Sequence, residues 1–217
     1  MKNIPRIFVG NDVTENTIVP VSADVAHYLD RVMRQRDCLV FGAGREYVAQ
    51  LSDDKRHLVI GSETAHTDPV GNVTLFFAPI KRTDDLINVA TQMGVAAFQP
   101  VITERTIAHH INWARMEKIA HEAAEQSNRN SVPKFFPEIK LADIDLHGMV
   151  FADERAAHGA DLPSVVASDK ILIGPEGGFS DAEFARLDAA GARGISLGKT
   201  VLRAELAAAV ALAKVTG

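Results

Sequence analysis

ILIGPEGGFSDAEFARLDAAGARGISLGKTVLRAELAAAVAL, residues 171–212, decides the predicted fold. Its first three residues are apolar and largely β-branched, and Gly174 with Pro175 ends the run. This pattern predicts a buried strand of a mainly parallel sheet. Gly177 and Gly178 follow, and their lack of side chains lets the backbone approach a ligand closely.

The order of strand, loop and helix occurs twice in this stretch. Ser180 and Glu183 fit a capping box, which predicts a helix over residues 181–190. Residues 195–198 repeat the apolar run that ends in glycine, and an alanine-rich helix is expected over residues 202–214. Open α/β sheets bind ligands at the edge where their strands end. The two glycine-bearing loops therefore predict a ligand site at that edge.

Neither common nucleotide signature is complete here. The pattern G-x-G-x-x-G is absent, because residues 174–178 read G-P-E-G-G. A phosphate loop needs glycine where Arg193 stands, and the residues that would form it look like the strand itself. An ATP-binding enzyme that uses Lys199 is therefore a minor alternative. Both loops could be tight turns that serve only the fold, but two on one edge, with Arg203 and Glu205 beyond, favour a site.

The composition is that of a soluble globular protein with one large domain or two small ones. The chain has 217 residues, of which 47% are hydrophobic. No apolar leader is visible near the N-terminus, so cytoplasmic residence is expected.

Cys38 is the only cysteine and is interpreted as a small buried side chain. No metal site is predicted, because Glu125 replaces the second histidine of an H-E-x-x-H that begins at His121. A net charge of −5 implies that any RNA contact is local.

The first 68 residues predict a small, largely antiparallel β domain. Short runs rich in β-branched and aromatic residues lie at residues 6–9, 38–41 and 47–51. A short helix is expected over residues 27–34, with Tyr28, Leu29 and Val32 on its apolar side. The turn-rich segment 61–72 places the domain boundary after residue 68.

Residues 73–217 predict an α/β domain. Strands are expected over residues 73–78, 95–101 and 149–152, and helices over residues 83–93 and 112–127. The order strand, helix, strand implies parallel pairing with a right-handed crossover. The apolar face of the first of these helices is predicted to hold Leu86, Ile87, Ala90 and Met93.

Two motifs carry a family resemblance. I-G-P-E-G-G-F-S at residues 173–180, followed by L-G-x-x-V-L-R-A-E-x-A at residues 197–207, resembles the signature of the RsmE-type methyltransferases. These are the 16S rRNA (uracil(1498)-N(3))-methyltransferases of the SPOUT superfamily. The resemblance implies a trefoil-knotted SPOUT domain over residues 73–217 that binds S-adenosylmethionine. It also implies a PUA-like β-barrel over residues 1–68 that binds RNA, and a homodimer.

The resemblance also implies which residues form the site. The cofactor is expected in three loops, after residue 152, after residue 173 and around residues 197–202. Its expected contacts are Ala152, Leu172, Ile173, Gly174, Pro175, Glu176, Gly177, Gly178, Leu197, Gly198, Val201 and Leu202. The side chains expected to contact RNA are those of Arg6, His27, Arg31, Arg34, Lys81, Arg82, Arg105, Gln126 and Asn128.

The implied reaction is methyl transfer from S-adenosylmethionine to N3 of a uracil in the RNA of the small ribosomal subunit. Loss of the N3 proton spreads negative charge over the two neighbouring carbonyl oxygens, and a cation should face them. Arg203 is the first candidate for that cation and Arg129 the second. Glu205 either orients Arg203 or accepts the proton.

Four departures from the family pattern leave an alternative open. Ala204 and Leu206 stand where the family usually has threonines, and Val89 and Gln92 where it commonly has lysine and glutamate. A non-catalytic RNA-binding protein of the same fold would tolerate these changes. It would bind RNA without methyl transfer.

Overall fold

The strand and helix that flank the glycine loop 174–178 are present in the computed structural model, which describes residues 4–68, 71–107 and 111–215. Strand β11 covers Lys170–Ile173, and helix α4 covers Asp181–Ala189. The Ser180 side chain accepts a hydrogen bond from the Glu183 backbone N–H, and the Glu183 carboxylate accepts one from the Ser180 N–H. The predicted capping box is therefore confirmed.

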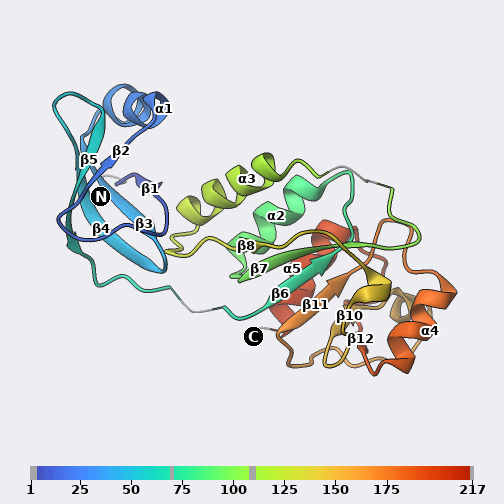
Figure 1. Ribbon diagram of the computed structural model, residues 1–217. Coiled ribbons are helices and arrows are strands. Elements are labelled where there is room, and N and C mark those ends of the chain that lie inside the picture. Colours follow the sequence, from blue (N-terminus) through green and yellow to red (C-terminus); the bar gives the residue numbers. More distant parts are fainter. Residues whose placement is uncertain (1–3, 69–70, 108–110, 216–217) are drawn as a thin grey trace. The chain divides into compact units, whose positions relative to one another are not determined.

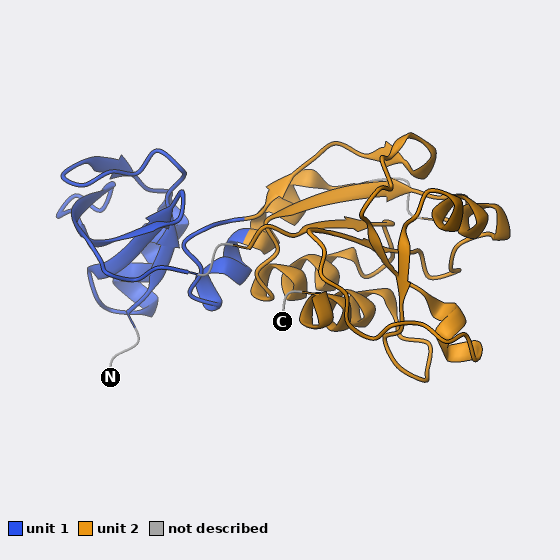
Figure 2. Ribbon diagram, turned by 90° about the horizontal axis from the view of Figure 1, so that it is seen from below, with its two compact units in different colours: residues 1–69, 121–132 blue, residues 70–120, 133–217 orange. Residues whose placement is uncertain are grey.

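The chain divides into two compact units, which Figure 2 shows in different colours. Unit 1 consists of residues 1–69 and 121–132, and unit 2 of residues 70–120 and 133–217. Helix α3, Trp113–Gln126, contributes to both units. The sequence does not predict this division, because the interior of a helix carries none of the Gly and Pro residues that indicate boundaries.

Unit 1 is built on a five-stranded sheet with the strand order β1-β3-β4-β5-β2 (Figure 1). The strands are β1 Arg6–Phe8, β2 Ile18–Pro20, β3 Asp37–Gly42, β4 Arg45–Leu51 and β5 His57–Glu63. All neighbours in this sheet are antiparallel except β1 and β3. Two strands are not predicted from the sequence. Strand β2 has only three residues and ends in proline, and the end of β5 lies in the turn-rich segment 61–72.

The predicted apolar face of the helix near residue 28 is confirmed for Leu29 and wrong for Tyr28 and Val32. Helix α1, Ala23–His27, continues into a π-helical turn, η1, over Tyr28–Val32. Leu29 is fully buried, whereas Tyr28 and Val32 are exposed. The wider π turn, with Met33 N–H bonded to the Tyr28 carbonyl, changes which side chains share a face, and a spacing of 3.6 residues does not describe it.

Cys38 lies in the core of unit 1, as predicted, and this gives a prediction about alkaline stability. Burial, with a smaller contribution from the Asp37 charge, raises the pKa of its thiol to about 12. The thiol of the unfolded chain ionises above pH ~8.5, so between that pH and 12 the unfolded chain holds fewer protons than the folded one. The free energy of unfolding should therefore fall as the pH rises, by about 2 kcal/mol at pH 10.

Urea unfolding at pH 7.5 and 10 should show this extra loss in the wild type and not in Cys38→Ala. An equal loss in both proteins would contradict it.

Unit 2 contains a parallel sheet with the strand order β12-β10-β11-β6-β7-β8, and β9 also pairs with β7. Figure 1 shows helices on its faces. The remaining strands are β6 Thr74–Phe77, β7 Ala97–Ile102, β8 Lys134–Phe135, β9 Ile139–Lys140, β10 Val150–Ala152 and β12 Arg193–Ile195. The remaining helices are α2 Thr83–Gln92, α5 Ala204–Val215 and the 3-10 turns η2 Leu141–Asp143 and η3 Glu154–His158. The predicted α/β class and parallel pairing are confirmed.

Two details of unit 2 differ from the predictions. Leu86, Ile87 and Ala90 are fully buried on α2, but Met93 is 38% exposed because the helix ends at Gln92. The last strand ends at Ile195, so residues 196–203 form a long loop before α5. Helix α5 then packs against α2 and β11. The loops that follow β10, β11 and β12 all leave the carboxyl edge of the sheet.

Within the described ranges, no helix is long and apolar enough to cross a membrane. The same residues contain no group of three or more His, Cys, Asp or Glu side chains placed to hold a metal ion.

Candidate functional site

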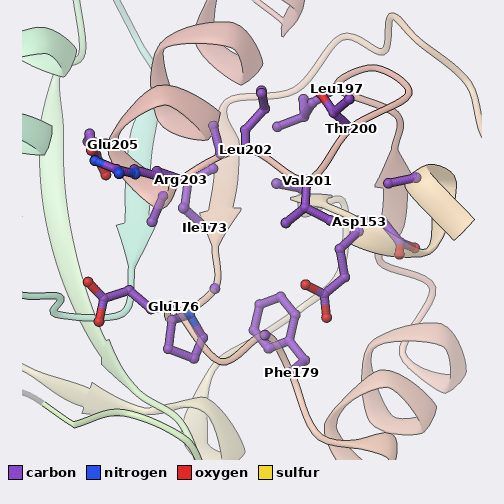
Figure 3. Close-up of a pocket in the computed structure, with 18 of the residues that line it drawn as sticks. Asp153, Ile173, Glu176, Phe179, Leu197, Thr200, Val201, Leu202, Arg203 and Glu205 are labelled. Atoms are coloured by element: carbon purple, nitrogen blue, oxygen red, sulfur yellow. The ribbon is translucent and has the colours of Figure 1, made fainter.

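A cavity of about 540 Å³ lies at the carboxyl edge of the unit 2 sheet (Figure 3). Pockets for small molecules are usually about 300–1,000 Å³, so this one fits a ligand of nucleoside size or larger. Its walls come from the loops that follow β6, β10, β11 and β12 and from the start of α5. The lining residues are Lys81, Arg82, Ala152, Asp153, Glu154, Ala157, Ile173, Gly174, Pro175, Glu176, Gly178, Phe179, Leu197, Gly198, Thr200, Val201, Leu202, Arg203, Ala204, Glu205 and Ala207.

The predicted cofactor contacts all line this cavity except Leu172 and Gly177. Successive side chains of a strand point to opposite faces, so Ile173 lines the cavity while Leu172 packs in the hydrophobic core. The Gly177 carbonyl instead accepts a hydrogen bond of 2.9 Å from Arg105.

Gly178 is the point where the glycine loop needs glycine most. Its φ is +68°, a left-handed conformation that other residues adopt only with strain. A β-carbon there would lie 2.1 Å from Oε1 of Glu154, on the neighbouring loop. The absence of a side chain thus keeps open the space between the loops after β10 and β11.

A charged network fixes the loop after β10. The carboxylate of Asp153 is fully buried and receives hydrogen bonds from Nε and Nη2 of Arg155, the shortest at 2.6 Å. Arg155 also contacts Asp188 of α4 at 2.9 Å, and its guanidinium lies 4.4 Å from the centre of the Phe184 ring. Hydrogen bonding to Arg155 lowers the pKa of the Asp188 carboxyl. Gly194 of β12 leaves room for Asp153, because a β-carbon there would lie 2.4 Å from its Oδ2.

Several lining residues are absent from the predicted set. Asp153 and Glu154 directly follow a predicted strand at the ligand-binding edge, so their position in the sequence could have identified them. Phe179 and Thr200 lie beside predicted contacts but carry no separate signal. The lining thus includes two carboxylates that the sequence analysis does not assign.

Three basic side chains and the carboxylate of Glu205 line one part of the cavity. Lys81 and Arg82, predicted to contact RNA, line it together with Arg203 and Glu205. Nη1 of Arg82 lies 2.9 Å from Oε1 of Glu205. Arg203 is exposed, and Figure 3 places it with Glu205 at one end of the cavity, across from Asp153.

The geometry excludes the phosphate-loop alternative. In such a loop the lysine and threonine open a helix that directly follows the glycines. Here Gly194 lies inside β12, and α5 begins only at Ala204, four residues after Thr200. Lys199 therefore does not stand at the start of a helix.

Arg105, predicted to contact RNA, donates hydrogen bonds to the backbone of the glycine loop. One Nη1 atom donates to the carbonyl oxygens of Gly177 at 2.9 Å and Phe179 at 3.2 Å. The neighbouring Glu104 N–H donates to the capping carboxylate of Glu183 at 2.8 Å. The segment after β7 thus holds both the glycine loop and the start of α4.

Arg6 is an internal residue of unit 1, which corrects its assignment as an RNA contact. Its Nε donates to Glu46 at 2.8 Å, and the exposed fractions of the two side chains are 7% and 5%. Its other N–H groups donate to the carbonyls of Ala124, Glu125 and Arg129 and to the Asn130 side chain. All five donors are used, so none is left for RNA in this conformation.

Removal of Arg6 should therefore destabilise the protein. Arg6→Met leaves the Glu46 carboxylate buried without its ion pair, which should cost about 3–5 kcal/mol. Thermal or urea unfolding measures this loss. Arg31→Met is the matched control, because Arg31 is exposed beside Asp30 and should change stability by less than about 0.5 kcal/mol. Equal stability of Arg6→Met and wild type would show that the pair is not structural.

The other predicted RNA contacts of unit 1 are exposed: His27, Arg31, Arg34, Gln126 and Asn128. Arg129, the second candidate for catalysis, is 7% exposed, lies 3.9 Å from Asp68 and is not among the residues that line the cavity. Burial lowers the pKa of its guanidinium. The structure thus brings Arg203 and Glu205 together in the cavity of unit 2, whereas Arg129 belongs to unit 1.

Comparison with known proteins gives consistent matches. Residues 66–216 match the family model described as an RNA methyltransferase domain. The chain is 31% identical to the ribosomal RNA small subunit methyltransferase E of Rickettsia conorii, and the match covers 97% of this chain and 94% of that protein. The protein of the same name from Synechocystis is 32% identical, over 94% of this chain and 74% of its own length.

A solved structure agrees with the same fold over nearly the whole chain. The ribosomal RNA small subunit methyltransferase E from Neisseria gonorrhoeae, in a crystal structure bound to S-adenosyl methionine, superposes with a TM-score of 0.82 and 28% identity. The match covers 97% of this chain and 96% of that one.

Proposed function

This chain belongs to the ribosomal RNA small subunit methyltransferase E family, and from that premise we propose that its cavity binds S-adenosylmethionine for methylation of N3 of a uracil in 16S rRNA. The observation that carries the proposal is the cavity itself. Its lining includes Gly174, Gly178 and Gly198 at the sheet edge. Arg203, which has no side-chain partner among the described residues, lies at one end (Figure 3).

The lining residues fit this cofactor in size and in chemistry. Ile173, Val201 and Leu202 offer apolar surface for the adenine ring, and the open backbone at Gly178 leaves space for a ligand close to the loop. The carboxylates of Asp153 and Glu154 are suited to the cofactor's hydroxyl and ammonium donors. The Asp153 carboxylate already accepts hydrogen bonds from Arg155. Glu154 can therefore accept more hydrogen bonds from a ligand than Asp153 can.

The protein's part in the reaction is to align the reactants and stabilise charge. When bound, the cofactor supplies a methyl carbon that its sulfonium makes electrophilic. As the bond from N3 to that carbon forms, the bond from carbon to sulfur breaks and a neutral thioether remains. The N3 proton must leave beforehand, and the resulting negative charge lies on the two carbonyl oxygens of the uracil. Arg203 is placed to stabilise it, as the donors of an oxyanion site do.

The finer features that the family implies belong to this proposal. A trefoil knot in unit 2 is supported by the position of β11 between β10 and β6 and by the return of α5 onto α2 and β11. A PUA-like barrel in unit 1 is supported by its five-stranded sheet. The exposed basic residues His27, Arg31 and Arg34 would contact RNA there.

A homodimer through α5 is also proposed. Four of the six alanines of α5 are buried inside this chain, namely Ala204, Ala207, Ala208 and Ala211, so these four do not form the dimer surface. Leu206 of α5 is 54% exposed and does not line the cavity, so it is an apolar side chain available to a second copy.

Transfer of labelled methyl groups tests the proposal. The protein is incubated with radiolabelled S-adenosylmethionine and small ribosomal subunits from a strain that lacks the modification, and the labelled base is then mapped. One labelled uracil, modified at N3, is expected. Cofactor binding without transfer would favour the non-catalytic alternative, and label on another base would contradict the proposed target.

A further inference from the structure

One ion pair in the cavity joins a residue expected to contact RNA to a residue expected to act in catalysis. Nη1 of Arg82 lies 2.9 Å from Oε1 of Glu205, whose side chain is 14% exposed. The same guanidinium contacts Asp85 through Nη2 at 2.6 Å and Nε at 2.7 Å. Asp85 lies in the first turn of α2 and Glu205 in the first turn of α5, so Arg82 bridges the starts of the two helices.

Two interactions therefore hold the Glu205 carboxylate. Its carboxylate is bonded to a guanidinium, and its position in the first turn of α5 places it at the positive end of the helix dipole. The guanidinium of Arg82 and the first turn of α5 thus fix the position of this carboxylate. Among the described residues, Arg203 has no side-chain hydrogen bond or ion pair to Glu205 or to any other group.

We propose that Arg82 is a positioning residue that holds Glu205 away from Arg203, so that the Arg203 guanidinium remains available to the acceptor base. This inference rests on the proposed methyl transfer. Glu205 is then neither the proton acceptor nor the group that orients Arg203. The N3 proton passes to solvent before the methyl group is transferred.

The proposal predicts how the two side chains depend on each other. Arg203, whose side chain has no hydrogen bond or ion pair among the described residues, lies at the same end of the cavity as Glu205 and would be open to it without Arg82 (Figure 3). The carboxylate should then pair with Arg203 and cancel the charge that the transition state needs. Loss of the Glu205 charge as well should release Arg203 again.

A double-mutant cycle in the full chain tests this, with S-adenosylmethionine and unmodified small subunits as substrates. Arg82→Met should lower kcat by roughly tenfold to a hundredfold, the size of effect that misplacement of a catalytic group produces. Glu205→Gln should lower it by less than about fivefold, the limit for one partly exposed ion pair. The double variant should be faster than Arg82→Met, and Arg82→Lys should recover part of the rate. Arg115→Met is the control. It also removes an arginine that pairs with an aspartate of α2, here Asp84, but Arg115 does not line the cavity.

The pH dependence of kcat shows whether Glu205 acts as a general base, and this test does not involve a change at Arg82. If the N3 proton goes to solvent, kcat rises with pH in the wild type and rises equally in Glu205→Gln. A loss of about a hundredfold or more in Glu205→Gln, together with a flattened pH profile, would identify Glu205 as a general base and overturn the inference. A double variant no faster than Arg82→Met would overturn it too. An inactive wild type that binds the cofactor would instead refute the proposed function.

Discussion

Replacement of Arg203 by alanine should lower kcat by about a hundredfold to a thousandfold while most of the affinity for S-adenosylmethionine is kept. Arg203 is exposed at one end of the cavity and has no partner among the described side chains, so its charge is free for the substrate. The uracil becomes anionic only on the way to the transition state. Loss of the cation therefore affects the rate much more than it affects cofactor binding.

Single-turnover kinetics with saturating cofactor, together with calorimetric titration of S-adenosylmethionine, measure the two quantities separately. Arg203→Lys should recover part of the rate, because an ammonium group keeps the charge but not the planar set of donors. Unchanged turnover in Arg203→Ala would remove Arg203 from the mechanism. A loss of cofactor affinity equal to the loss of rate would make it a binding residue instead.

Replacement of Gly178 by alanine should weaken the binding of S-adenosylmethionine by roughly fivefold to a hundredfold or more. A left-handed conformation costs a residue other than glycine about 1–3 kcal/mol, so the loop of the free variant should relax out of it and binding of the cofactor would have to restore it. The new β-carbon would also lie 2.1 Å from Oε1 of Glu154, so this side chain, which lines the cavity, would have to move.

Gly177 provides a matched control in the same loop. A β-carbon there would lie 3.6 Å from Arg105, an ordinary contact, and Gly177 does not line the cavity. Gly177→Ala should therefore bind the cofactor with nearly wild-type affinity. Calorimetry on both variants decides the matter. Equal affinities for the two would mean that the loop backbone does not form the cofactor's cradle.

Local patterns predict the elements near the site well. The capping box of Ser180 and Glu183 specifies the start of α4, and the short β-branched run 171–173 specifies β11. Both signals act within a few residues, so they can be recognised without knowledge of the rest of the fold. The cofactor loops follow because parallel strands place their carboxyl ends at one edge.

Contacts between distant residues could not be predicted in the same way. Arg6 and Glu46 are 40 positions apart, and nothing in the sequence near Arg6 distinguishes an internal ion pair from an RNA contact. The pair of Arg82 and Glu205 depends on the packing of α5 against α2, which joins segments more than a hundred residues apart. The choice between Leu172 and Ile173 depends on which face of β11 meets the cavity, and a fully buried strand is apolar on both faces.

The most direct test of the central claim is a crystal structure of this protein with S-adenosylmethionine. The cofactor should lie between the loop at residues 174–178 and the loop at residues 197–202, with its methyl group directed toward Arg203. Electron density for it anywhere else, or a methyl group facing away from Arg203, would contradict the account.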